Sequence, residues 1–401
     1  MFRKIFTAWV LVATILFAQI VSAAELDEIK NLSAKYYANG KEIARHFAEL
    51  RTYSDHGTHH AALVAIKSLE AADALDRATL DNPWYSSIDR RELEIAAYMH
   101  DTGMDGGRFK TYTDGNALRK DHSLNSAIHV LENREAIAGM GVNVDAVALD
   151  CMGHSKSCSG VRDLTSWEQW TDCFNRIDEA VALYNEKFPA AQIFFDKSTW
   201  TTGDTYKNKK GVEVYKFNRE TLARSAATVA ALRLGDANRE AAQYPYTQTG
   251  AKIEVDFDSY VPAAKTWRDE IAKAKIFMVD EDGNRTSLLE QGVDTAGFGR
   301  MYMSGEGNLS MICEFNPQTQ NLREVFRVLH GASFPLSTQE CIEERLGELD
   351  TMKKFPVEAH IQIVGDYSKV DKKKITRTYE RYCRDATRKH QFPVTFEFSK
   401  E

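Results

Sequence analysis

The sequence predicts an all-α helical bundle followed by a C-terminal α+β domain. Up to about residue 240, apolar residues recur at three-and-four spacing, the periodicity of amphipathic helices. Beyond residues 241–252, short runs of alternating apolar and polar residues predict strands, with helices between the later ones. The 401 residues are enough for two domains, each with its own core. We therefore expect a helical domain over 25–248 and an α+β domain over 249–401.

Residues 1–24 have the pattern of a secretory signal peptide. Arg3 and Lys4 precede an apolar segment that ends in small residues, so cleavage is expected after Ala23 or Ala24. An uncleaved membrane anchor is the alternative. No later segment is long and apolar enough to span a bilayer, so no stable membrane insertion is expected after cleavage. We expect an exported protein, periplasmic or secreted.

The helical domain is expected to contain seven helices and one loop or small hairpin. Glycine or polar residues separate the helical segments. The hairpin is expected over 198–220, where Gly, Thr and Lys precede the run VEVYKF. The helices are expected over 26–50, 60–75, 90–100, 124–137, 144–153, 167–188 and 221–240.

The C-terminal domain is expected to place helices on one face of a mainly antiparallel sheet. EDGN at 281–284 is a turn signal and favours a hairpin there. Strands are expected over 252–260, 275–282, 308–315, 357–366 and 393–399, and helices over 319–329, 338–349 and 373–390.

The formal net charge of −7 is unlike that of most nucleic-acid-binding proteins. Nucleic acid is therefore not an expected partner, although a local basic patch stays compatible with the sequence. Short basic runs begin at Lys207 (KNKK) and Lys372 (KKK), and we interpret both as solvated loops.

Six cysteines in an exported chain suggest disulfides, but their connectivity does not follow from the sequence. Three lie in each half, which implies either a bridge between the domains or unpaired thiols. Cys151 and Cys158 could close a short loop around His154. The absence of any CxxC pair makes a zinc–thiolate site the weaker alternative.

Histidines are concentrated in the helical domain. Seven of the eleven lie between residues 56 and 154, and histidine is the commonest metal-binding side chain. If the helices form a bundle, one metal ion could be bound by His60, His100, Asp101 and Asp236. His122 and His154 could add a second ion, with Asp101 bridging the two. Mixed imidazole and carboxylate ligands suit Mn, Fe, Zn or Mg, so the sequence selects neither the metal nor whether one or two ions bind.

These motifs resemble the HD-domain superfamily of metal-dependent phosphohydrolases over roughly residues 50–240. DHGTHHAALV is similar to the helix of the family's first ligand and indicates His60 rather than His59. AAYMHDTG and LRLGDAN are similar to the segments that carry the family's HD pair and last Asp. DHSLNSAI and MGHSKS resemble the extra-histidine positions of two-metal members, including the HD-GYP phosphodiesterases.

The resemblance implies a metal-dependent phosphohydrolase or phosphodiesterase whose substrate is a small phosphate ester or nucleotide. Asp101 would orient the water nucleophile, and His56 or His59 would serve acid–base catalysis or substrate contact. Four cations could bind the phosphate of the substrate: Lys110, Arg119, Lys120 and Lys156. Among them we select Lys120.

Other functions stay open. Two-iron oxygenases on this scaffold use a similar ligand set, and a metal-stabilised ligand-binding or sensor module would show no turnover. Arg233 is expected to have a structural role, by pairing with a carboxylate. The oligomeric state and the role of the C-terminal domain do not follow from the sequence.

Overall fold

A computed structural model describes the helical part almost continuously and the C-terminal part in segments. The described residues are 26–47, 50, 55–79, 87–236, 252–256, 275–279, 282–287, 322–328, 332–336, 342–343, 346–347, 349–350, 358–365 and 371–399. The expected signal peptide, the strand at 308–315 and the domain boundary at 248 lie outside them. Among the described helices, none is both long and apolar enough to cross a membrane.

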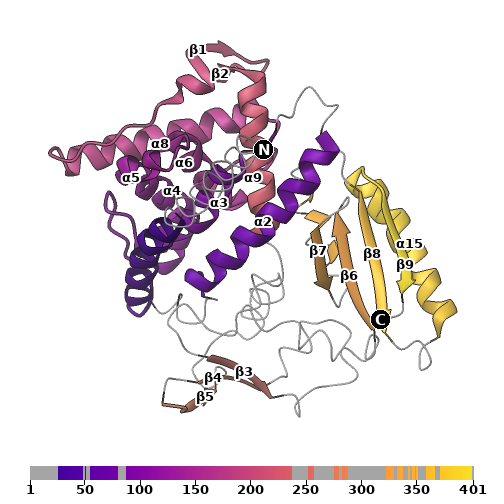
Figure 1. Cartoon of the computed structure of the whole chain (residues 1–401). Helices are drawn as coiled ribbons and strands as arrows, with labels where there is room; N and C mark the ends of the chain where they lie inside the picture. The colour runs from indigo at the N-terminus through magenta and orange to yellow at the C-terminus, as the bar shows by residue number, and fades with distance from the viewer. Residues whose placement is uncertain are drawn as a thin grey trace, which may run out of the picture.

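The first part of the chain is a helical bundle with one β-hairpin (Figure 1). A helix over residues 26–44 comes first. The following elements are α2 (Thr58–Thr79), α3 (Arg90–Met99), the 3₁₀ helix η2 (Thr102–Asp105), α4 (Gly115–Glu132), α5 (Arg134–Gly139), α6 (Val144–Gly153), α7 (Lys156–Ser159), α8 (Trp167–Lys187), the 3₁₀ helix η3 (Lys197–Thr199), β1 (Thr201–Lys207), β2 (Glu213–Phe217) and α9 (Arg219–Asp236).

Helix pairs that are distant in sequence form the bundle. Helix α2 packs against α9 and α3, while α6 packs against α3, α4 and α9. Two glycines allow their helices to approach a neighbouring helix closely. A Cβ on Gly235 of α9 would lie 2.0 Å from Ser68 Oγ of α2, and one on Gly153 of α6 would lie 2.7 Å from a Val229 methyl group of α9. The core is apolar and fully buried, with Trp170, Phe174 and other large side chains at its centre.

The described segments of the C-terminal part form two small sheets and one long helix. β3 (Lys252–Asp256), β4 (Lys275–Val279) and β5 (Arg285–Ser287) form an antiparallel sheet. The second sheet has the order β7-β6-β8-β9, with β6 (Leu322–Val328), β7 (Ala332–Leu336), β8 (Ala359–Gly365) and β9 (Val394–Ser399). Helix α15 (Lys372–His390) connects β8 to the parallel strand β9 and packs on the sheet (Figure 1).

Most of the elements expected from periodicity are present, but the helix expected over 124–137 is divided between α4, which begins earlier, and α5. Helix α6 has the expected bounds, and the β4–β5 hairpin turns at Gly283, whose φ of +81° suits glycine. The helix expected over 319–329 is wrong, because 322–328 forms β6. This strand hydrogen-bonds to both β7 and β8, so pairing with two neighbours prevails over its helical periodicity.

Two further expectations are corrected. Cys151 and Cys158 form no disulfide with each other, and the two other described cysteines form none either. Their sulfurs face different backbone carbonyls, that of Ala96 for Cys151 and that of Arg119 for Cys158. The basic run at Lys372 is not a loop, because it forms the first turn of α15.

Candidate metal centre

Six ligand-type side chains meet inside the helical bundle, although the first and last are far apart in the sequence. All are buried except Asp236, whose side chain is 30% exposed. They come from the first turn of α2 (His60), the end of α3 (His100 and Asp101), the middle of α4 (His122), the end of α6 (His154) and the last residue of α9 (Asp236).

Helices α3 and α6 position their histidines in the same way. Each contains ten residues and ends at a histidine C-cap, His100 or His154. Each begins after a capping side chain, Asp89 or Asn143, which accepts hydrogen bonds from two first-turn amides. The same short-range capping pattern therefore fixes the register of both histidines on their helices.

Asp101 lies at the middle of the cluster, and its two oxygens face different histidines. Oδ2 lies 3.0 Å from His100 Nε2 and 3.5 Å from His60 Nε2. Oδ1 lies 3.1 Å from His122 Nε2 and 3.3 Å from His154 Nε2. One carboxylate therefore faces two separate pairs of imidazoles.

Asp236 completes the first of two groups that could each hold an ion. Its Oδ1 lies 3.2 Å from His60 Nε2 and 3.6 Å from His100 Nε2. The first group comprises these three residues and Asp101, and the second comprises Asp101 with the histidines of α4 and α6. Within each group, one ligand atom per residue lies within 4.8 Å of all the others.

Backbone carbonyls fix the tautomers of three of these histidines. Nδ1 of His100 donates to the carbonyl three residues earlier at 2.7 Å, and Nδ1 of His154 does the same at 2.6 Å. His122 makes the equivalent bond. Because Nδ1 carries the proton, the Nε2 lone pair of each neutral ring points into the cluster, as in metal-bound histidines.

This arrangement brings acceptor atoms together and so fits a cation. Imidazole Nε2 lone pairs and carboxylate oxygens repel one another at 3.0–3.6 Å unless a positive charge lies between them. In the described part of the chain, His100 Nε2 and both oxygens of Asp101 have no hydrogen-bond partner. Buried acceptors without partners are costly, and divalent metal coordination would satisfy them.

The pKa shifts of His100 and Asp101 have the sign expected when a proton on the histidine supplies the positive charge that a bound cation would supply. Burial opposes protonation of His100, yet the charge of Asp101 and the close approach of the Asp101 and Asp236 carboxylates to its Nε2 raise its pKa to about 9. Burial would raise the pKa of Asp101, but His100 and His56 hold it well below its usual range. For His154, burial lowers the pKa. Its Nε2 lies 3.0 Å from that of His122, and such a pair can share only one proton.

His56 lies at the edge of the first group and outside both potential ligand sets. It is buried, its Nε2 lies 4.0 Å from Asp101 Oδ2, and its ring centroid lies 5.0 Å from that of His60. His59, one residue before His60, is exposed. The structure therefore brings His56, rather than His59, to the cluster.

The structure does not bring Lys120 to the cluster. It is exposed on α4, two positions before His122 and hence about 200° around the helix from it. Two of the other candidate cations have partners elsewhere: Lys110 pairs with Asp121 at 2.6 Å, and Lys156 donates to the Gly347 carbonyl.

Two neighbours of the cluster have contacts that the sequence did not reveal. Arg233 donates to the carbonyls of Gly153 and Val161, and so holds the end of α6 next to His154. These carbonyl contacts give Arg233 a structural role, and the expected pairing with a carboxylate stays a prediction. The Cys158 sulfur lies 3.6 Å from His122 Nδ1. No motif pointed to this contact, since residues 122 and 158 meet only through helix packing.

His129 lies outside the cluster. It is buried, pairs with Asp105 at 3.0 Å and stacks on Tyr36 with ring centroids 4.0 Å apart. One face of α4 therefore carries two histidines with different surroundings, His122 in the cluster and His129 in the core.

Comparison with known proteins gives no assignment. No protein-family model, curated protein or solved structure matches the chain. The fold and the cluster thus define a helical bundle with a buried His/Asp centre, and the function has to be inferred from the centre itself.

Proposed function

We propose that this protein is an exported metal-dependent hydrolase of phosphate esters, of the HD-domain type, with a mononuclear or dinuclear centre. The single observation that carries the proposal is the position of Asp101, whose two oxygens face two different pairs of histidines. A bridging carboxylate between two imidazole sets is suited to two adjacent cations, which is an arrangement used for phosphoryl chemistry.

The residues have distinct tasks in this proposal. His60, His100, Asp101 and Asp236 would hold one ion, and Asp101, His122 and His154 would hold the other. Bound divalent ions lower the pKa of a coordinated water and stabilise negative charge on phosphoryl oxygens. The carbonyl contacts of Nδ1 keep the histidine rings oriented for coordination. His56 is placed to exchange a proton beside Asp101.

Metal analysis combined with turnover tests the proposal. We expect purified protein loaded with Mn to bind one or two ions and to hydrolyse bis(p-nitrophenyl) phosphate. His100→Ala should abolish metal retention and turnover, because it removes a buried ligand. His59→Ala is the matched control, since it removes an exposed histidine beside His60. Full turnover by His100→Ala would refute the site assignment.

Measurements on the same metal-loaded protein distinguish two other functions. Two bound irons with substrate-dependent oxygen uptake would indicate an oxygenase. Tightly bound metal without hydrolysis of any phosphate ester or oxygen uptake would leave a binding or sensor module. In that case the Asp101 carboxylate would only help to bind the metal.

A further inference from the structure

Helix α15 presents a row of cations that the metal centre does not use. Lys374, Arg377, Arg381 and Arg384 follow one another at spacings of three and four residues, so they share one face of the helix. At 1.5 Å per residue this row is about 15 Å long. Lys373 stands beside it, and all five side chains are exposed.

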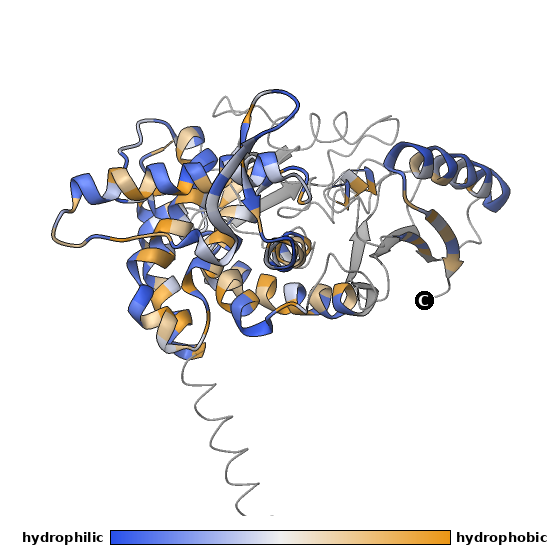
Figure 2. Ribbon diagram, turned by 90° about the horizontal axis from the view of Figure 1, so that it is seen from above, coloured by the Kyte–Doolittle hydropathy of each residue, from blue (hydrophilic) through white to orange (hydrophobic). Residues whose placement is uncertain are grey.

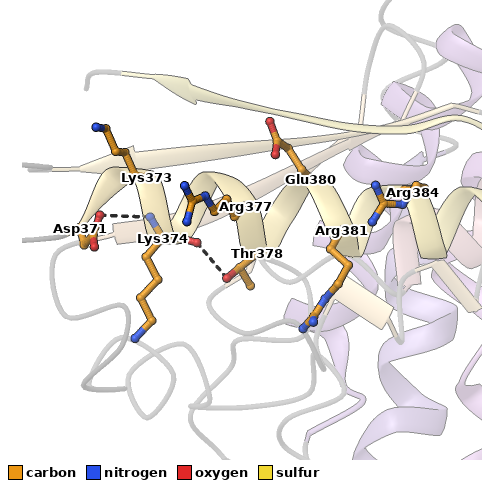
Figure 3. Close-up of a pocket in the computed structure, with 8 residues that line it drawn as sticks. All are labelled: Asp371, Lys373, Lys374, Arg377, Thr378, Glu380, Arg381 and Arg384. Atoms are coloured by element: carbon orange, nitrogen blue, oxygen red, sulfur yellow. Dashed lines mark hydrogen bonds between the residues drawn. The ribbon is translucent and has the colours of Figure 1, made fainter.

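These residues line a shallow hollow of about 680 Å³ (Figure 3). Lys374 and Arg381 extend from the same side of the helix, two turns apart (Figure 3). The lining contains five cations against two carboxylates, Asp371 and Glu380. Asp371 is engaged as the N-cap, where it accepts from the Lys374 amide at 3.1 Å.

No ion pair neutralises the row among the described residues, although Glu380 lies on the same helix. Ion pairs do form further along α15, between Arg388 and Asp385 and between Lys389 and Glu343. For Lys373, Lys374 and the three arginines of the row, the described part of the chain offers no ion pair. Like charges at these spacings repel one another, and the lysines of the first turn also face the positive end of the helix dipole. A bound anion would relieve both effects.

The opposite face of α15 is already covered. Tyr379, Cys383 and Ala386 are buried, and the Tyr379 ring lies 5.7 Å from that of Phe396 on β9. Figure 2 shows α15 as a largely hydrophilic helix at the edge of the molecule. Because its apolar face packs on the sheet, α15 has no free apolar face to insert into a bilayer. A soluble anion therefore suits this surface better than a membrane.

We propose that this row, Lys374, Arg377, Arg381 and Arg384 with Lys373, binds a linear chain of phosphate groups. Arginine forks match phosphate oxygens in bidentate geometry, and a row of about 15 Å accommodates several linked phosphates. The protein has an overall charge of −7, so this cationic row departs locally from its acidic character. No exposed aromatic side chain lies between the cations, so stacking of nucleic-acid bases is not provided for.

Titration of the full chain with inorganic polyphosphate of about 15 units tests this inference. Binding should weaken with salt, with a slope of log K against log salt of about −3 if four phosphates are contacted. The triple variant Arg377→Gln, Arg381→Gln, Arg384→Gln should lose at least tenfold in affinity. Circular dichroism should show unchanged helicity, because these positions are exposed and glutamine is a good helix former.

A matched control removes three exposed lysines from the β1–β2 hairpin: Lys207→Gln, Lys209→Gln, Lys210→Gln. It changes the net charge equally and should alter affinity less than twofold. Equal losses in both variants would overturn the proposal, because binding would then follow net charge alone.

Three further results would overturn it. They are the absence of polyphosphate binding, binding of oligothymidylate without polyphosphate, and arginine-dependent binding to phosphatidylglycerol vesicles but not to polyphosphate. Polyphosphate binding does not depend on the metal centre. The His100→Ala protein should therefore bind polyphosphate as the unaltered protein does.

Discussion

Helices α3 and α6 carry two buried acidic clusters that differ in their neighbours. At one, Asp101 is surrounded by imidazoles, which hold its pKa well below the usual range despite burial. At the other, Glu92 of α3 and Asp150 of α6 are buried close together. Burial and then the charge of Asp89 raise the pKa of Glu92 to about 7, and burial and then Glu92 raise that of Asp150.

The difference shows what turns buried carboxylates into a candidate metal centre. Burial is equally deep for Asp101 and Asp150, at 1% and 0% exposure. Neither oxygen of Asp150 has a hydrogen-bond partner in the described part of the chain. What distinguishes Asp101 is the convergence of oriented imidazole lone pairs. Burial raises the pKa of the Glu92 and Asp150 carboxyls, whereas the neighbouring histidines hold that of Asp101 low.

The largest effect is expected from Asp101→Asn. This change removes the charge shared by both groups, so metal affinity should fall by more than about 100-fold, beyond the loss typical of an outer-sphere partner. Metal content after dialysis measures it. Asp105→Asn is the control, since Asp105 pairs with His129 outside the cluster. Retention of metal by the Asp101→Asn protein would contradict the interpretation that Asp101, unlike the Glu92–Asp150 cluster, belongs to a metal centre.

Gly235→Ala should damage the first cluster through helix packing. The new Cβ would lie 2.6 Å from the Ser68 backbone nitrogen, so α9 would have to move away from α2. Overpacking of this kind costs about 1–3 kcal/mol of unfolding free energy, measured by urea denaturation. Metal affinity should fall too, because Asp236 and His60 are on these two helices. An unchanged unfolding free energy would contradict the close approach.

Glu92→Gln should change the pH dependence of stability. A carboxyl with a folded pKa of about 7 against an unfolded value of 4.5 stabilises the fold only while protonated. This contribution is fully present below pH 4.5 and is lost as pH rises through 7. At pH 8 the variant should be more stable than the unaltered protein by roughly 1–3 kcal/mol, and the gain should shrink by pH 5. Urea denaturation at both pH values measures this.

Glu94→Gln is the control for this pH dependence. Glu94 is partly exposed on the same helix and lies 4.0 Å from Arg91. It should leave the difference between pH 5 and pH 8 unchanged. Equal behaviour of the two variants would show that the Glu92–Asp150 cluster is not protonated in the folded state.

Gly139→Ala should give the smallest effect and sharpens the interpretation of Gly235→Ala. Apart from the backbone of α5 itself and the two chain neighbours, no atom of the described residues lies within 4 Å of a Cβ placed on Gly139. Alanine should therefore stabilise the fold by about 0.5–1 kcal/mol through helix propensity, with metal affinity unaltered. A thermal or urea denaturation curve measures the gain. Destabilisation at both glycines would show that helical glycine itself, rather than the α2–α9 contact, is critical.

The sequence by itself determined the helical part and the residue types at its centre. Short-range patterns are sufficient there, since the bounds of α6 follow from Asn143 and apolar spacing. In the C-terminal part, the β4–β5 turn follows from Gly283. The potential ligands were recognisable because His100–Asp101 and the other motifs occur in a known order. The same local reasoning was wrong for β6, whose hydrogen bonds join segments distant in the chain.

Only the tertiary structure decided which side chains meet. It placed Lys120 on the exposed side of α4, kept Cys151 and Cys158 from forming a disulfide with each other, and buried Asp150 near the charge of Glu92. It also placed the two oxygens of Asp101 next to different pairs of histidines. Periodicity and capping act within a few residues, whereas the direction in which a side chain points into a core depends on how whole helices pack.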